Sequence, residues 1–502
     1  MLARNLTVVA LLLTFRSTGI PAQNAGSIVT AASKAMGVDT LKSITYSGTA
    51  RNGAFGQSKS IGEPMGPVNL TLITAYTRTI NFQSSDPASL ASRATGPTQP
   101  PTVPGAPPPT PGVFNQNITG TQAGTIWAQG LNVWTTPWGF LKAASGAGNA
   151  TVRQQGGQQL VSFSPANFKS PSGQPYVVTG YLDSQNMVTK VETRVEHAVA
   201  GDLLVEFEYS NYQNMNGVQV PARIVQRQAG VQTFDAAITA ATPNPSNLTE
   251  LLTPPPPPGR AGAPAAGAPP APPAAAPAAP AGPPQAEQIG DGVFKIGGNY
   301  TSLAIDMGDH ILVVESGQND ARGMDVMAAA KKAIPNKPVR FVVNSHPHFD
   351  HAGGLGAAAA EGAMILTHRN NEPVLERLLA GPRTLIGDSL SKVSNRRTNV
   401  VEAVGDRDVR KGTNGKIVEL HRIPNEHSDG LIAVFLPAEK VVWTADITAV
   451  NPTPAQLPAL KATVDTLTRL KIDYTTWIPA HPPNPDRPLT RADVEAAAKG
   501  GA

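Results

Sequence analysis

Residues 344–355 read NSHPHFDHAGGL and place three histidines and one aspartate within six consecutive residues. The chain of 502 residues has nine histidines and no cysteine, so a third of its histidines lie in this stretch. The apolar run VRFVVN before it predicts a strand, and the glycines after it predict a turn into a helix. Imidazole and carboxylate groups this close together are typical ligands of zinc and related metal ions.

The spacing within this stretch indicates two sets of ligands. His346 and His348 are two residues apart, so in an extended segment their imidazoles point to the same side and toward one ion. Asp350 and His351 follow where the chain turns into the helix, and they point past that ion toward a second position. The lack of cysteine excludes zinc–thiolate sites, disulfides and thiol catalysis.

The motif His-x-His-x-Asp-His resembles that of the metallo-β-lactamase superfamily, and later motifs extend the resemblance over residues 288–485. The segments NEHSDG, WTAD and PAHP supply a histidine, an aspartate and a histidine in the order that the family needs. The resemblance implies an αββα sandwich with a dinuclear metal site along one edge. It implies that the first ion is held by His346, His348 and His427, the second by Asp350, His351 and His481, and that Asp446 bridges the two ions.

The same resemblance implies an activity. Two zinc ions would activate a water molecule, oriented by Asp350, for attack on a small-molecule ester, lactone, thioester or amide, β-lactams included. The residues leave two other functions open. One is an iron-dependent oxidoreductase of the same fold, because these nitrogen and oxygen ligands also accept iron. The other is a binding protein for an apolar ligand with a vestigial metal domain.

Composition divides the chain into segments. Residues 253–288 are almost entirely proline, alanine and glycine, which predicts a semi-extended linker with nothing to bury. We therefore expect a signal peptide at 1–22, a β-rich domain at 23–252, the linker at 253–288 and the metal domain at 289–502. Because such a linker cannot pack, a fragment from about residue 288 to 502 is expected to fold and bind about two metal ions by itself.

The β-rich domain is predicted from alternating apolar residues around polar turns at 183–186 and at Asn216-Gly217. One amphipathic helix is expected at 27–44, and the proline-rich residues 96–112 are expected to form a disordered insertion. The entry helix, SITYSGTA after it and the late meander resemble the outer-membrane lipoprotein carrier family. That resemblance implies a curved antiparallel sheet, a half-barrel with a helix over its open side, and a concave apolar surface on which an apolar ligand could bind. A β-domain that only packs and separates its neighbours is the other interpretation.

The amino-terminal residues predict export. Arg4 precedes the apolar run LTVVALLLTF, which is too short for a bilayer span of about 20 residues, and Ala22 offers a cleavage point. We expect a secreted or periplasmic protein without a transmembrane segment in its mature chain. The net charge of +4 shows no clustered basic face, so no nucleic-acid partner is expected.

Several other polar residues receive structural interpretations. His368 is interpreted as a strand-end polar residue, His421 is not expected to be a ligand, and residues 405–416 are expected to form a solvated hairpin. His197 and His310 are predicted to be surface turn residues, and Arg383 is predicted to be a solvated loop arginine.

Overall fold

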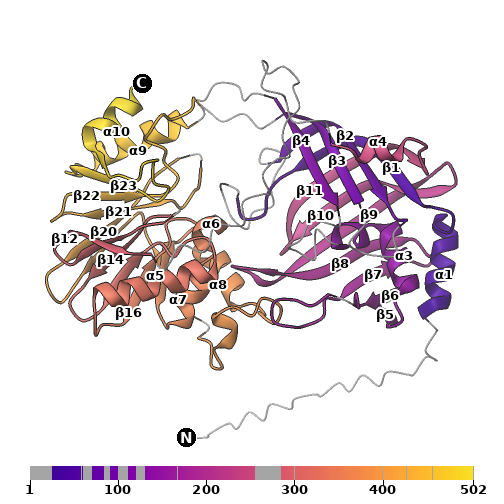
Figure 1. The fold of residues 1–502 in the computed structure, drawn as a ribbon, viewed down its shortest axis with the longest axis horizontal. Coiled ribbons are helices and arrows are strands. Elements are labelled where there is room, and N and C mark those ends of the chain that lie inside the picture. Colours follow the sequence, from indigo (N-terminus) through magenta and orange to yellow (C-terminus); the bar gives the residue numbers. More distant parts are fainter. Residues whose placement is uncertain are drawn as a thin grey trace, which may run out of the picture.

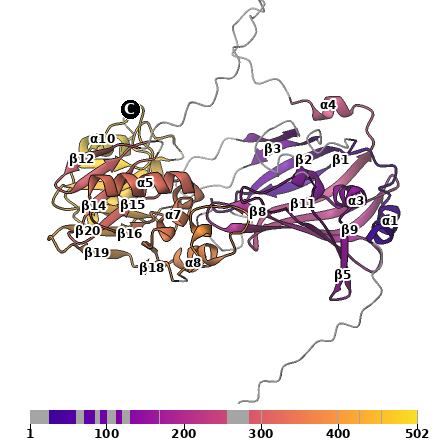
Figure 2. The same ribbon diagram turned by 60° about the horizontal axis from the view of Figure 1, so that its bottom comes forward.

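The computed structural model describes residues 25–57, 59, 70–83, 91–99, 111–119, 130–166, 168–254, 284–298, 300–397, 399–425, 427–454 and 456–500. The expected signal peptide and most of the expected linker lie outside these residues. No helix within these ranges is long and apolar enough to cross a membrane. Figures 1 and 2 show two lobes, one on each side of the linker in the sequence.

The amino-terminal lobe is built on one antiparallel sheet of eleven strands in the order β4-β3-β2-β1-β11-β10-β9-β8-β7-β6-β5. The strands are β1 (Ser43–Asn52), β2 (Thr71–Asn81), β3 (Ala91–Gln99), β4 (Gly112–Thr119), β5 (Thr151–Gln155), β6 (Gln158–Phe163), β7 (Val178–Leu182), β8 (Val188–His197), β9 (Gly201–Met215), β10 (Val218–Gln228) and β11 (Val231–Pro243). Its helices are α1 (Ala25–Met36), α2 (Asn132–Trp134), α3 (Pro137–Gly146) and α4 (Leu248–Leu252). Trp138 of α3 is fully buried, and its indole N–H donates to the carbonyl of Gln219 in β10.

The predicted turns of this lobe are present. Asn216 and Gly217 join β9 to β10 with φ values of 56° and 85°, which are the left-handed conformations that such a hairpin needs. The predicted helix at 27–44 is shorter than expected. It ends at Met36 because Gly37 turns the chain with φ 69°, and a Cβ there would lie 2.1 Å from the carbonyl oxygen of Gly217.

The expectation of a disordered insertion at 96–112 is wrong at its two ends. Residues 96–99 belong to β3 and residue 112 begins β4, and the two strands pair from Ala91 with Thr119 to Thr98 with Gly112. Residues 100–110 lie outside the described ranges. The two ends of the predicted insertion are therefore ordered by backbone pairing between β3 and β4. Their composition alone had indicated a loop.

The carboxy-terminal lobe contains two sheets and helices that cover them. The seven-stranded sheet has β12 (Ala286–Gly290), β13 (Val293–Ile296), β14 (Ser302–Asp306), β15 (Ile311–Val314), β16 (Val339–Val343), β17 (Met364–His368) and β18 (Val401–Val404) in that order. The six-stranded sheet has β19 (Arg407–Lys411), β20 (Ile417–Arg422), β21 (Ile432–Leu436), β22 (Val441–Thr444), β23 (Thr476–Pro479) and β24 (Leu489–Thr490). The helices are α5 (Asp320–Ala333), α6 (Phe349–Ala352), α7 (Leu355–Ala360), α8 (Glu372–Ala380), α9 (Leu457–Arg469) and α10 (Arg491–Ala498), with the 3-10 turn η3 (Leu390–Lys392).

Burial on both faces of each sheet produces a helix–sheet–sheet–helix order of layers. Leu312 of β15 and Trp443 of β22 belong to the apolar core between the sheets. Val313, which points to the other face of its strand, packs with residues of α5 and α7. Trp477 of β23 packs on the opposite outer side with residues of α9 and α10. The layering agrees with the sandwich expected for this region, and β19 and β20 form the expected hairpin.

The two lobes pack directly against each other, in the region where Figures 1 and 2 show the end of β8 beside α8. Arg383, in the loop after α8, donates from Nη1 to the carbonyl of Val199 (2.8 Å) and from Nη2 to that of Ala198 (2.6 Å). Its Nε and Nη2 also donate to Asp388, and the two side chains are only 1 % and 2 % exposed. Arg383 is therefore not the solvated loop arginine that we expected.

A second set of hydrogen bonds joins the same two segments. Asp202 at the start of β9 accepts from the hydroxyl of Thr384 (2.7 Å) and from the backbone N–H of Leu385 (2.9 Å). The backbone N–H of Ser172 donates to the carbonyl of Leu385 at 3.1 Å. A continuous cluster of buried apolar side chains also runs from the large sheet to the carboxy-terminal lobe. The contact is thus a packed interface between the described parts of the two lobes.

Two histidines differ from the surface turn residues that we expected. His197 ends β8, and its Nδ1 accepts from the backbone N–H groups of Val199 and Ala200. Burial lowers the pKa of His197 to about 4, so this side chain is neutral at neutral pH. His310 is 7 % exposed and lies against the ring of Phe341. His197 is therefore half-buried by its contact with the other lobe, and His310 is buried against a strand.

Candidate metal centre

The sequence-predicted ligands all lie at the carboxyl ends of strands along one edge of the sandwich. His346 and His348 follow β16, and α6 then carries Asp350 and His351. From the other sheet, His427 lies between β20 and β21, Asp446 follows β22 and His481 follows β23. Because β16 is parallel to its neighbours, and β22 is parallel to β23, these strands deliver their ligands to the same edge.

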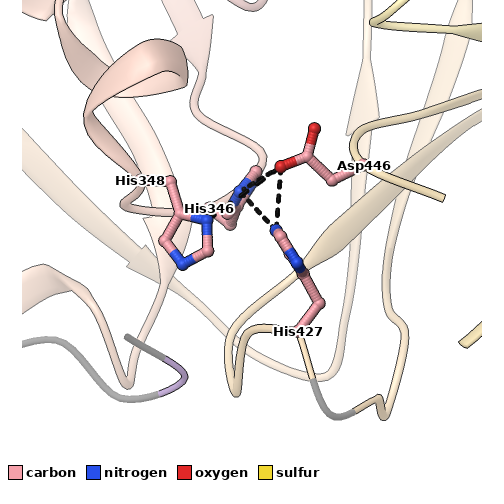
Figure 3. Close-up of side chains that lie close together, drawn as sticks. All are labelled: His346, His348, His427 and Asp446. Carbon is pink, nitrogen blue, oxygen red and sulfur yellow. Dashed lines mark hydrogen bonds and ion pairs between the residues drawn. The ribbon is translucent and has the colours of Figure 1, made fainter. Parts of the chain in front are cut away.

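The seven side chains form two groups that share Asp446. One group contains His346, His348, His427 and Asp446, and the other contains Asp350, His351, Asp446 and His481. Within each group the potential ligand atoms lie within 4.8 Å of one another. Figure 3 shows the imidazoles of His346 and His427 directed at the carboxylate of Asp446, with His348 beside them. The members of these groups are the residues of the two ligand sets that the sequence resemblance implies.

The two oxygens of Asp446 face different groups. Its Oδ2 lies 3.1 Å from His346 Nε2 and 2.8 Å from His427 Nε2. Its Oδ1 lies 2.9 Å from His351 Nε2 and 2.6 Å from His481 Nε2. Asp446 has φ 53°, a left-handed conformation that aspartate adopts more readily than most residues. The sharp turn after β22 therefore places this carboxylate between the histidines.

The donor set fits metal ions. The Nε2 atoms of His351 and His481 lie 3.2 Å apart, and those of His346 and His427 lie 3.3 Å apart. Imidazole nitrogens that converge in this way around a carboxylate can all act as ligands to borderline ions such as zinc. The Nδ1 atoms of His346 and His351 are engaged elsewhere, by Ser345 and Glu315. The atoms directed at the centre of each group are thus those available for a cation.

Burial and mutual contacts shift the protonation of the cluster. Burial raises the pKa of Asp446, but hydrogen bonds from the surrounding histidines outweigh burial and hold this pKa well below its usual value. Burial, together with the neighbouring His351, lowers the pKa of His346. Burial also acts to lower the pKa of His351, but hydrogen bonds to Asp446 and Glu315 raise it to about 10. Asp446 is therefore the fixed negative charge of the centre.

Two residues that sequence reasoning missed support the second group. Glu315 follows β15 and is fully buried, and its Oε2 accepts from the hydroxyl of Ser345 (2.5 Å) and lies 3.1 Å from His351 Nδ1. A carboxylate partner of this kind fixes the ring orientation of a ligating histidine. The sequence indicates this residue, because in HILVVES the acidic Glu315 directly follows an apolar strand and precedes a turn.

Tyr300 is the other missed residue. Its hydroxyl donates to Asp350 Oδ2 at 3.5 Å, and its ring packs on His351 and His481. Burial and the negative charge of Asp350 raise the pKa of Tyr300 to about 12. The phenol therefore keeps its proton at neutral pH and remains a hydrogen-bond donor at the edge of the cluster.

The other histidines lie away from the centre. His368 Nε2 lies 3.1 Å from Asp406, and His421 Nε2 lies 2.8 Å from Glu419. Neither histidine belongs to either ligand group among the residues that the structure describes. His368 ends β17, as the strand-end interpretation expected.

Comparisons with known proteins agree with this geometry. Residues 296–481 match the family model of the metallo-β-lactamase superfamily. The alpha subunit of a 2,4-dinitroanisole O-demethylase from Nocardioides sp. (strain JS1661) is 26 % identical over 201 residues, which are 38 % of this chain and 54 % of that protein. The chain thus spans about half the length of this curated relative.

Solved structures of metallo-β-lactamases are also similar. The Hirschia baltica structure is 20 % identical, with 43 % of this chain and 97 % of that chain covered and a TM-score of 0.32. The Pontibacter korlensis structure is 14 % identical, with 43 % and 97 % covered and a TM-score of 0.33. The family model identifies the carboxy-terminal region as a metallo-β-lactamase superfamily domain with a hydrolase-like fold.

Proposed function

We propose that the protein is an exported, metal-dependent hydrolase with a small-molecule substrate. The observation that carries the proposal is the position of Asp446, whose two oxygens each face one set of ligands. A carboxylate shared in this way suits two cations about 3.5–4 Å apart. His346, His348 and His427 would hold the first, and Asp350, His351 and His481 the second. Two bound zinc ions would supply Lewis acidity and lower the pKa of a water molecule.

The chain itself would orient the reactants. The side chain of Asp350 is 32 % exposed, so its Oδ2 can accept a hydrogen bond from a water molecule that enters the centre. Tyr300 keeps its proton and can donate to an oxygen that becomes negative during attack. Glu315 fixes the orientation of the His351 ring through its contact with Nδ1. These roles suit attack on the carbonyl group of an ester, lactone, thioester or amide, including a β-lactam.

The experiment that tests the proposal is a hydrolysis screen with metal-loaded full-length protein. The panel contains esters, lactones, thioesters and β-lactams, together with 2,4-dinitroanisole because of the relative named for it. We expect turnover of at least one class, with loss on chelation and in Asp350→Asn. A fully loaded protein that turns over none of these substrates would exclude the proposed hydrolysis.

An iron-dependent oxidoreductase remains the alternative for this centre, because the same ligand types bind either metal. Metal analysis of protein produced without added zinc separates the two proposals. Zinc in both positions supports the hydrolase, whereas iron that is retained through purification supports the oxidoreductase.

The ligand partition gives a testable prediction of its own. His346→Ala or His427→Ala should deplete the first ion, because each removes one of three histidines from that position. His481→Ala should mainly deplete the second ion, since the first keeps its own three histidines. Metal content of the purified variants by atomic emission checks the partition. The same loss of both ions in all three variants would contradict it.

A second candidate function concerns the amino-terminal lobe. We propose that this lobe, like the lipoprotein carriers that its sequence resembles, binds an apolar ligand. A cleft of about 960 Å³ supports this, because its walls include Phe82, Trp134, Leu141, Phe163 and Phe168. The lining also contains polar side chains, Asp39, Lys142 and Asn149 among them. Ligand sites typically combine apolar walls with a small number of polar groups. Mass spectrometry of organic extracts of the purified protein should detect a bound lipid, and extracts without one would count against this function.

A further inference from the structure

The described residues at the start of the β1–β2 loop, 53–57 and 59, lie beside the metal centre of the other lobe. Phe55 of this loop is buried and lies edge-on against the ring of Phe349, with ring centroids 4.9 Å apart. His197, at the end of β8, contacts the same ring at 4.3 Å. Phe349 stands between the ligands His348 and Asp350 in the sequence. Two side chains of one lobe thus fix the segment of the other lobe that carries those ligands.

Gly56 makes this close approach sterically feasible. A Cβ at this position would lie 2.2 Å from the Phe349 ring, and the residue has φ 73°. Any other residue would have to push the ring or the loop away. The glycine therefore lets the backbone pass over Phe349 and brings the next residue, Gln57, to the ligand cluster.

Gln57 makes the contact that matters for the centre. Its Nε2 donates to Asp350 Oδ1 at 3.0 Å, across 293 residues of sequence. The other oxygen, Asp350 Oδ2, lies 3.4 Å from His351 Nε2 and 3.9 Å from His481 Nε2. One oxygen is thus held by the amino-terminal lobe, while the other faces the ligands of the second position. A neutral donor on the outer oxygen restricts rotation of the carboxylate without competing for the cation.

The same loop also contacts the segment that carries a ligand of the first position. The backbone N–H of Asp429 donates to the carbonyl of Lys59 at 2.9 Å. Lys59 Nζ lies 3.8 Å from the carboxylate of Asp429, two residues after the ligand His427. Phe55, Gln57 and Lys59 of the β1–β2 loop therefore contact the ligand-bearing segments of both groups.

We propose that the amino-terminal lobe is part of the metal centre, with Gln57 as a positioning residue that holds Asp350 in the orientation for the second ion. This inference rests on the proposed function, because it assumes that the cluster binds metal. The packed interface between the lobes would then help to position a metal ligand. The centre would then be complete only in the two-lobe chain.

The test measures metal affinity rather than activity. Full-length Gln57→Met keeps the length of the side chain but lacks the donor, and zinc affinity is measured by competition with a chromophoric chelator. We expect the second ion to bind about 10- to 100-fold more weakly, as is typical when an outer partner of a ligand is lost. The first ion should keep its affinity. Gln185→Met, at an exposed turn of the same lobe, is the matched control and should bind both ions like the parent.

A double-mutant cycle with Asp350→Asn shows whether Gln57 acts through Asp350. In the Asp350→Asn background, Gln57→Met should add little further loss of affinity. Parent-like zinc binding by Gln57→Met, or an equal loss with and without Asp350→Asn, would overturn the inference and leave the proposed function intact. A parent protein that binds no ion would instead overturn the proposed function, and this inference with it.

Discussion

Asp446→Asn should lose metal from both positions at once. The substitution keeps the size of the side chain but removes the negative charge that both groups of histidines face. Two cations at this separation repel each other strongly in a site of low dielectric, and the shared carboxylate offsets part of that repulsion. Activity and affinity should fall by more than the roughly 10- to 100-fold that loss of an outer partner costs. Metal content and hydrolysis rates of the purified variant check this.

His368→Ala is the control for this substitution. His368 is a buried histidine of the same domain, but its Nε2 contacts Asp406 rather than any ligand. It should retain both ions and most of the activity. If Asp446→Asn kept both ions while His368→Ala lost them, the assignment of the bridging carboxylate would be mistaken.

Arg383→Met should produce the largest loss of stability among the single changes considered. It would leave Asp388 buried without its cation, and removal of one partner from a buried pair typically costs about 3–5 kcal/mol. The carbonyls of Ala198 and Val199 would also lose their donors. Because a two-lobe chain need not unfold in one step, tryptophan fluorescence during urea unfolding should be read as a shift of midpoints.

Two further variants make this prediction specific. Arg223→Met removes an arginine that also pairs with an aspartate, Asp235, but whose side chain is 54 % exposed. Exposed pairs contribute about 0–1 kcal/mol, so its unfolding curve should hardly move. The double variant Arg383→Met with Asp388→Leu should recover part of the lost stability, because no unpaired charge stays buried. Equal midpoints for Arg383→Met and Arg223→Met would contradict the interface described above.

Local patterns predicted much of the carboxy-terminal fold and the grouping of the candidate ligands. His346, His348, Asp350 and His351 lie within six residues, so the strand before them and the turn after them determine their arrangement. The later ligands each follow a strand of the second sheet, and parallel pairing brings strand ends together. The Asn216-Gly217 hairpin was predictable for the same reason, because its geometry depends on neighbours in the sequence.

Contacts between the lobes could not be predicted in this way. Gln57 and Asp350 are 293 residues apart, and nothing in the residues around Gln57 indicates a partner. Arg383 lies in a polar, proline-containing loop that is typical of solvated surface, yet the other lobe buries it. His197 is half-buried because it packs against Phe349 of the other lobe. When two domains dock, the residues that become buried depend on the shapes of both domains. A local sequence pattern does not predict those shapes.

The contacts between the lobes also change the metal affinity that is expected of the isolated metal domain. A fragment from about residue 288 to 502 keeps all seven ligands, as the sequence predicts. The fragment would lack the hydrogen bond that Gln57 donates to Asp350. It would also lack the contacts of Phe55 and His197 with Phe349. We therefore expect its second ion to bind more weakly than in the full chain, in parallel with Gln57→Met.

Anomalous X-ray diffraction from crystals of the full-length protein tests the central claim most directly. Data collected on both sides of the zinc and iron absorption edges would locate any bound metal and identify its element. The account predicts two zinc peaks about 3.5–4 Å apart, one on each side of the Asp446 carboxylate. No peak between these seven side chains in crystals grown with zinc, or peaks only elsewhere on the molecule, would contradict it.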